Sequence, residues 1–235
     1  MEIIGYLASA LIGISLGLIG GGGSILTVPV MVYLFGVNPL LDTSYSLFIV
    51  GATSSVGAYQ SFRNSQVNIK TSLLFGISSI TTVFIIRKVL IPRLPSQLFT
   101  IDGFQITLNM MTMVLFALLM LAASFSMIKD KKSSVPNLPT HSGHTSTLLI
   151  YGVGIGFATG LLGAGGGFLL IPTLVILLRL PMKEAVGTSL MIIAMNSLVG
   201  FSGDLGHFKI DWPLLLRLTV IAIAGVFIGI FLSTK

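Results

Sequence analysis

The sequence predicts an all-α polytopic membrane protein with about nine hydrophobic segments in two inverted repeats, each containing a glycine-rich broken or re-entrant hairpin. Three observations predict it. Of the 235 residues, 54% are hydrophobic and 9% are charged, whereas about a quarter of the residues in a soluble domain are charged. Apolar runs recur that approach the roughly 20 residues needed to cross a bilayer. A glycine-rich string that ends in proline occurs twice, 143 positions apart, which is typical of transporters built from two related halves.

The apolar runs are separated by short polar or glycine-rich breaks, and they cover residues 3–19, 24–36, 44–61, 70–91, 106–128, 146–162, 167–180, 187–203 and 212–232. The N-terminus carries an acid where a cleavable signal would be basic, so the first run is expected to remain in the protein. The clearest break, 129–145, is polar and proline-bearing and reads as a flexible linker. It separates a first repeat half, 1–128, from a second half, 146–235.

The basic residues set the predicted orientation. The lysine cluster of the linker is expected in the cytoplasm by the positive-inside rule, and alternation then places four further basic loop residues and the C-terminus there: Arg63, Lys70, Arg179, Lys183 and Lys235. Glu2, Asp42 and the 204–211 loop fall outside. Three basic residues beside an outside loop speak against this assignment, namely Arg87, Lys88 and Arg93. Five segments separate corresponding elements of the two halves. Because an odd number of membrane crossings reverses orientation, the second half is predicted to be inverted relative to the first.

The duplicated strings run from Gly17 to Pro29 and from Gly160 to Pro172. Consecutive glycines free the backbone to leave the helix and point several N–H groups at one place, and the following helix start adds a positive dipole end. The predicted anion-binding residues are therefore Gly20, Gly22, Gly23, Ser24, Gly163, Gly165, Gly166 and Gly167. The simpler alternative is close helix packing, which is the role expected of the isolated Gly13, Gly152, Gly154 and Gly156.

Polar side chains follow each motif and could line a cavity for a small oxyanion. They are Thr43, Ser44, Ser46, Thr53, Ser54 and Ser55 in the first half, and Thr188, Ser189, Asn196 and Ser197 in the second. We favour Thr188, Ser189 and Asn196 because they closely follow the second motif, although each could serve only helix packing. Asp204 and His207 have the spacing of a proton relay, but their loop is polar enough to be merely solvated.

Several classes of function are disfavoured. The chain has no cysteine, which excludes disulfides, thiolate metal sites and thiol nucleophiles. Its basic residues are scattered between apolar runs, so no nucleic-acid partner is expected. No lysine follows the first glycine string as a nucleotide-binding loop requires, and no constellation of nucleophile, base or metal ligands supports an enzyme. No metal and no cofactor are predicted, and the expected partners are the lipid bilayer and a small solute.

The motifs resemble those of the TauE/SafE sulfite-exporter-like permease family over nearly the whole chain. The resemblance rests on the duplicated strings, with Gly17, Gly20, Gly22, Gly23 and Pro29 matching Gly160, Gly163, Gly165, Gly166 and Pro172, and on Gly187-Thr-Ser-Leu190 after the second string. The first half departs from this pattern and reads Asp42-Thr-Ser-Tyr-Ser-Leu47 at the corresponding place. The resemblance implies a multi-pass inner or plasma membrane protein that moves sulfur-containing anions such as sulfite, organosulfonates or sulfoacetate.

The hypothesis from the sequence is therefore a secondary transporter that moves a small sulfur-containing anion by alternating access, coupled to a proton, another ion or the substrate gradient. A passive anion channel is the alternative, because it would use the same donors along a continuous pore. A structural subunit would leave the duplicated glycine breaks without a purpose. The sequence does not identify the anion, the direction of transport, the coupling ion or the oligomeric state.

Overall fold

A computed structural model gives the structure of the protein and describes residues 2–20, 24–37, 39–93, 97–101, 104–107, 145–163, 165–207 and 210–233, together with scattered positions between 110 and 125. Within these residues the fold is predominantly helical, as predicted. The helices are α1 (Glu2–Ile19), α2 (Ser24–Phe35), α3 (Pro39–Arg63), α4 (Ile69–Ile85), α6 (Thr145–Leu162), α7 (Gly167–Leu178), α8 (Met182–Asp204) and α9 (Trp212–Ser233). A π-helical turn, η2 (Ile86–Leu90), and a 3-10 turn, η3 (Ile91–Arg93), extend α4.

Every predicted apolar run except 106–128 corresponds to one of these helices. Three described helical stretches are long and apolar enough to cross a membrane, Ile69–Arg93, Met182–Asp204 and Trp212–Leu232, and shorter apolar helices lie at Ile4–Leu18, Leu26–Phe35 and Leu148–Leu162. The predicted linker lies outside the described residues except for Thr145, and most of 106–128 does too.

The all-α prediction fails at one place. Residues Gln97–Ile101 and Phe104–Thr107 form an antiparallel two-stranded hairpin, β1 and β2, and β2 occupies the start of the predicted run 106–128. The physical reason can be read in the sequence. Aromatic and β-branched residues flank an Asp-Gly pair at 102–103, and this pair is a strong signal for a hairpin turn.

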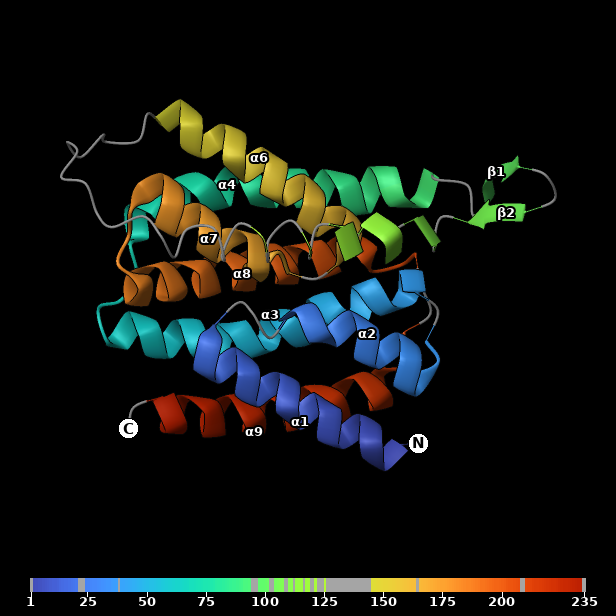
Figure 1. Ribbon diagram of the computed structural model, residues 1–235, viewed down its shortest axis with the longest axis horizontal. Helices are drawn as coiled ribbons and strands as arrows, with labels where there is room; N and C mark the ends of the chain where they lie inside the picture. Colours follow the sequence, from blue (N-terminus) through green and yellow to red (C-terminus); the bar gives the residue numbers. More distant parts are fainter. Residues whose placement is uncertain are drawn as a thin grey trace.

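The helices form a layered bundle in which α3 and α8 occupy the middle (Figure 1). On one side α4 packs against α6, and on the other side α1 packs against α9. In Figure 1, α1 begins at the end of the bundle marked N, where α2 also lies, whereas α6 begins at the opposite end, near which α7 ends. The breaks between α1 and α2 and between α6 and α7 therefore fall toward the middle of the bundle.

Glycines let the outer helix pairs approach closely. A methyl group on Gly13 of α1 would lie 2.0 Å from the carbonyl oxygen of Ala222 of α9, and one on Gly225 would lie 2.4 Å from the carbonyl oxygen of Ala10. The spacing of Gly13 and Gly17 matches that of Gly225 and Gly229, which is the small-residue pattern of tightly packed membrane helices. Gly152 and Gly156 of α6 likewise approach α4, so the packing role expected of isolated glycines holds there, whereas Gly154 faces open space.

These contacts recur between the halves. Gly17 packs on Val226, and Gly160, which lies 143 positions after Gly17, packs on Val83, which lies 143 positions before Val226. The same exchange relates three further pairs of contacts: Gly13–Ala222 with Gly156–Ser79, Gly57–Leu190 with Gly200–Leu47, and Gly20–Val186 with Gly163–Thr43. In these four pairs, a glycine of the first half contacts a residue of the second half. The two equivalent positions, 143 residues away, make the same contact with the halves exchanged.

Candidate functional site

The second glycine string forms a compact turn between α6 and α7. Gly163, Gly165 and Gly166 have φ values of +68°, +66° and +69°, a left-handed conformation that side chains disfavour. Space is equally restrictive, because a methyl group on Gly163 would lie 2.4 Å from Cβ of Thr43 on α3. Gly166 precedes Gly167, the first residue of α7, without a side-chain cap. This turn, residues 163–167, is called the second tip below.

Buried polar atoms without partners surround the second tip. A methyl group on Gly166 would lie 2.1 Å from Oγ1 of Thr159, and one on Gly165 would lie 3.1 Å from Oγ of Ser197. Both side chains are buried, and neither hydroxyl makes a hydrogen bond among the described residues. Because buried polar atoms are nearly always satisfied, such groups call for water or an ion that they could bind. The second tip is thus a small polar region inside an apolar bundle.

The first glycine string is described only in part. Gly20 has φ of +77° and packs on Val186 of α8, the counterpart of the Gly163 contact with Thr43. Ser24 is fully buried at the start of α2. The predicted site residues Gly22 and Gly23 lie outside the described residues. Gly20 and Ser24 bracket the first tip, as Gly163 and Gly167 bracket the second.

The structure separates the three polar residues that the sequence favoured. Thr188 Oγ1 accepts a hydrogen bond of 2.9 Å from the backbone N–H of Asn68, and the Ser189 hydroxyl donates to the carbonyl of Val186. Asn196 lies two helical turns further along α8, where its Nδ2 donates to Ser79 Oγ at 2.7 Å and its Oδ1 has no partner in the described part of the chain. Asn196 is next to Ser197 and hence near the second tip, while Thr188 serves the junction between α4 and α8.

A buried ion pair lies at the other end of α8. Nη1 of Arg87 is 3.0 Å from Oδ2 of Asp204, and the two side chains are 0% and 1% exposed. The same Nη1 donates to Thr43 Oγ1 at 2.9 Å, and the Ser44 hydroxyl donates to Asp204. We call these four residues the Arg87 cluster. It joins η2, α3 and α8, and a π-helical turn is frequently found at a functional site.

The Arg87 cluster corrects two interpretations of the sequence. Arg87 is not a loop charge, so it no longer counts against the predicted orientation, although Lys88 and Arg93 are exposed at this end. Asp204 is not positioned for a relay with His207: its carboxylate contacts Arg87 and Ser44, and His207 is exposed and donates its backbone N–H to the Asp204 carbonyl. The overlooked signal was a cation inside the apolar run 70–91, because ionisable residues in such runs are costly and usually functional.

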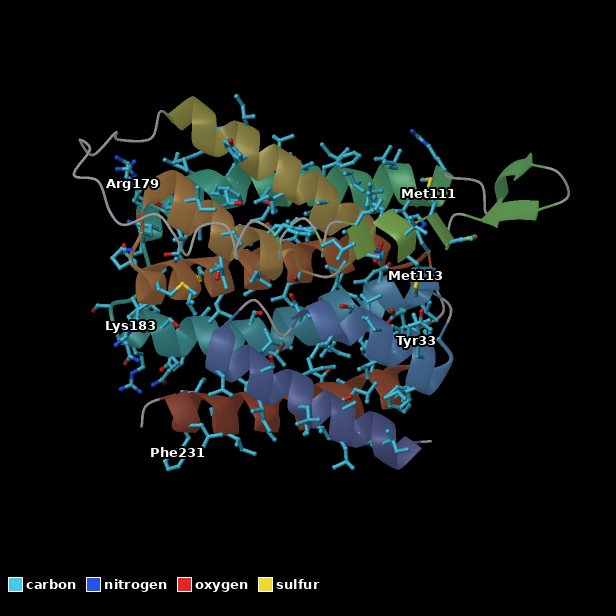
Figure 2. All side chains as sticks on the ribbon, in the orientation of Figure 1. Tyr33, Met111, Met113, Arg179, Lys183 and Phe231 are labelled. Carbon is cyan, nitrogen blue, oxygen red and sulfur yellow. The ribbon has the colours of Figure 1, made fainter. Side chains whose placement is uncertain are left out.

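A cavity of about 590 Å³ opens at the opposite end, between the ends of α1, α3 and α9 and the start of α8. Gly57 and Leu190 lie deep in it, whereas Asn64 and Lys183 are exposed at its rim. Figure 2 shows Arg179 and Lys183 at this end of the bundle and Tyr33 at the other. The cavity therefore lies at the end predicted to be cytoplasmic. No group of three or more His, Asp or Glu side chains suited to a metal ion occurs in the described part of the chain.

Comparisons with known proteins find a transporter family and relatives named as membrane transporters. The family model described as sulfite exporter TauE/SafE matches residues 5–235. A "probable membrane transporter protein" of Xylella fastidiosa is 28% identical over 235 residues, covering 97% of this chain and 83% of the relative. The "probable membrane transporter proteins" YunE of Bacillus subtilis and MJ0441 of Methanocaldococcus jannaschii are 28% and 23% identical, each covering 93% of this chain and 83% and 80% of the relative. No solved structure matches significantly.

Proposed function

Because the chain belongs to the sulfite exporter TauE/SafE family, we propose that this membrane transporter moves a small sulfur-containing anion, such as sulfite or an organosulfonate, by alternating access. The relatives that match over most of its length are named probable membrane transporter proteins. The observation that carries the substrate proposal is the second tip, where three left-handed glycines meet buried hydroxyls that have no partner within the described ranges. No titratable side chain is needed there, which suits a carrier rather than an enzyme.

The two halves act as inverted repeats in this proposal. Support comes from the glycine contacts that recur at a separation of 143 residues with the halves exchanged, and from the opposite ends at which α1 and α6 begin (Figure 1). Inverted repeats place their broken helices near the bilayer midplane, where substrate sites of secondary transporters commonly lie. Irregular backbone at that depth is tolerated because protein or a water-filled cavity surrounds it.

The proposed anion site uses backbone N–H groups of the two tips, with hydroxyls beside the second. These donors follow Gly20 and Gly163, whose own N–H groups donate to the carbonyls of Leu16 and Thr159. A helix start with N–H groups aimed at one place attracts an anion through hydrogen bonds and the helix dipole. Thr159 and Ser197 add donors that could replace lost hydration. Asn196 lies beside Ser197, whereas Thr188 joins α8 to the start of α4 and Ser189 donates within α8.

Alternating access is supported by the contrast between the two ends of the bundle. The 590 Å³ cavity reaches inward from the Lys183 end to Gly57 and Leu190, while the Arg87 cluster ties η2, α3 and α8 together at the other end. We assign the cavity to a conformation open toward the cytoplasm, with the linker 129–145 on the same side of the cell membrane. The exposed Arg179 and Lys183 support this orientation by the positive-inside rule.

Uptake of labelled sulfite into liposomes that contain the purified protein tests the proposal, with taurine, sulfoacetate, thiosulfate and sulfate as competitors. We expect flux that saturates, that competitors reduce, and that is stimulated by unlabelled sulfite on the opposite side. Flux that rises linearly with concentration and shows no such counterflow would favour the passive channel instead. No flux of any of these anions above that of empty liposomes would overturn the substrate class.

A further inference from the structure

The carboxyl group of Asp42 on α3 is buried and makes no hydrogen bond to any residue that the structure describes. The side chain is 0% exposed, and neither Oδ1 nor Oδ2 has a partner among the described residues. The other acidic side chains that the structure describes are each engaged: Asp204 with Arg87, Glu184 with Asn68, and Asp211 with the N–H of Leu214. Asp42 lies in the first turn of α3, where the helix dipole offers only a weak attraction for a negative charge.

Asp42 heads a stripe of residues on one face of α3. Ser46, Val50 and Ser54 follow it at intervals of four, which places all four residues on the same side of the helix. All are fully buried, and the hydroxyls of Ser46 and Ser54 also have no partner among the described residues. We call these residues the α3 stripe. Such a series of unsatisfied groups is expected to hold water or an ion rather than to stay dry.

The α3 stripe passes the second tip on the helix whose other end lines the cavity. At one end Gly163 contacts Thr43, the neighbour of Asp42, and further along Gly165 contacts Val50, so the second tip lies along the stripe. At the other end α3 continues to Gly57 and Ser61, which line the cavity. Asp42 therefore lies close enough to the second tip for its charge to act on anything bound there, and it begins a row of buried groups on α3 that leads toward the cavity.

Nothing described near Asp42 balances a negative charge. The titratable side chains that the structure describes at this end of the bundle, on α3, on the elements around it and in the loop before α9, are Tyr6, Tyr33, Tyr45, Arg87, Lys88, Arg93, Asp204, His207, Asp211 and Arg217. Only Arg87, Asp204 and Tyr45 among them are buried. Arg87 is paired with Asp204, and the Tyr45 hydroxyl accepts from the N–H of Asp211. A lone carboxylate in such surroundings is unfavourable, whereas the neutral acid is not.

Resting on the anion-carrier function proposed above, we propose that Asp42 is the binding site of the coupling proton, so that proton and anion cross the membrane together. The carboxylate binds one proton and becomes a neutral acid, which removes the negative charge that would repel an anion at the second tip. By linkage, each ligand then tightens the binding of the other. Loss of the proton toward the opposite side releases the anion there.

The test measures labelled sulfite in liposomes across an imposed pH gradient, for the unaltered protein, Asp42→Asn and Glu184→Gln. With one proton per monovalent anion, a gradient of one pH unit should drive accumulation of about tenfold, since a free energy of 1.4 kcal/mol corresponds to tenfold. Asp42→Asn imitates the neutral acid, so it should still exchange sulfite but accumulate none against a gradient. Glu184→Gln changes a carboxylate that already accepts a hydrogen bond from Asn68 and should retain coupling.

The outcomes are distinguishable. Sulfite flux in the unaltered protein that follows a sodium gradient or ignores the pH gradient would overturn the role of Asp42 and leave the carrier proposal standing. Accumulation of sulfite driven by the pH gradient in Asp42→Asn would also overturn the role of Asp42 and leave the carrier proposal standing. Absence of flux in the unaltered protein would overturn both proposals. If Asp42→Asn does not exchange sulfite, the affinity for sulfite is measured against pH for the purified variant and the unaltered protein. We expect the two affinities to differ more as the pH rises. Identical pH profiles would overturn the role of Asp42.

Discussion

Nη1 of Arg87 lies 3.0 Å from Oδ2 of Asp204 within the bundle, where both side chains are essentially inaccessible to solvent. The pair is supported by Ser44 and Thr43 of α3, so one ion pair connects three parts of the bundle at the end opposite the cavity. The remaining guanidinium atoms, Nε and Nη2, and Asp204 Oδ1 have no partners among the described residues. A buried pair of this kind is sensitive to loss of either member, because the other charge is then left unpaired.

Breaking the pair should destabilise the protein. We expect Arg87→Gln and Asp204→Asn each to lower the free energy of unfolding by about 3–5 kcal/mol, the cost of an uncompensated buried charge. The double variant should recover much of that loss, since it buries no charge. Unfolding of the detergent-solubilised protein measures the effect. Single variants as stable as the unaltered protein would show that Arg87 and Asp204 are not paired as described.

A second prediction concerns the contact between α1 and α9. Gly13→Ala adds a methyl group that would lie 2.0 Å from a backbone oxygen of α9, so the helices must separate, at a cost of about 1–3 kcal/mol. Gly154→Ala is the matched control, because none of the residues that the structure describes lies within 4 Å of its added methyl group. Thermal unfolding in detergent should therefore show a lower unfolding temperature for Gly13→Ala and an unchanged one for Gly154→Ala. Equal stability of both variants would mean that α1 and α9 are not packed at Gly13.

The predicted orientation can be tested by labelling, because the chain has no native cysteine. A membrane-impermeant thiol reagent should modify Lys183→Cys from the cytoplasmic side and Leu205→Cys from the outside, since both residues are exposed and lie at opposite ends of α8. Ser46→Cys, which is buried in the α3 stripe, should react slowly from either side. Labelling of Lys183→Cys from outside would reverse the assigned orientation.

Much of the helical framework was predictable from the sequence because membrane helices appear there as long runs of apolar residues. The predicted runs 3–19 and 212–232 differ from α1 and α9 by one residue at an end. The start of α3 was missed, because Asp42 and Thr43 are polar although both side chains are buried. The β1–β2 hairpin was missed because its apolar residues were read as part of a membrane segment and the Asp-Gly pair was overlooked.

For the candidate site, the sequence predicted the positions of the glycine breaks but not the side chains that surround them. Glycine strings indicate where the backbone leaves the helix, and Gly20 and Gly163 do adopt the left-handed conformation. The side chains around the second tip are set by the packing of α3, α6 and α8. Residue spacing along the sequence does not reveal how these helices pack. Thr159 was therefore not singled out, and Arg87 was treated as a charge flanking an outside loop although it contacts a residue 117 positions away.

The central claim is that an anion binds at the glycine tips, and saturable sulfite flux in Gly166→Ala and Gly206→Ala tests it most directly. Both glycines have positive φ, +69° and +93°, but no atom of a described residue lies within 4 Å of a methyl group on Gly206. The Gly206→Ala variant therefore carries backbone strain outside the tips. Loss of one hydrogen bond to a charged ligand, worth about 1.5–3 kcal/mol, predicts flux about 10- to 100-fold lower for Gly166→Ala. Gly206→Ala should transport normally. A folded Gly166→Ala protein with unchanged flux and affinity would contradict the account.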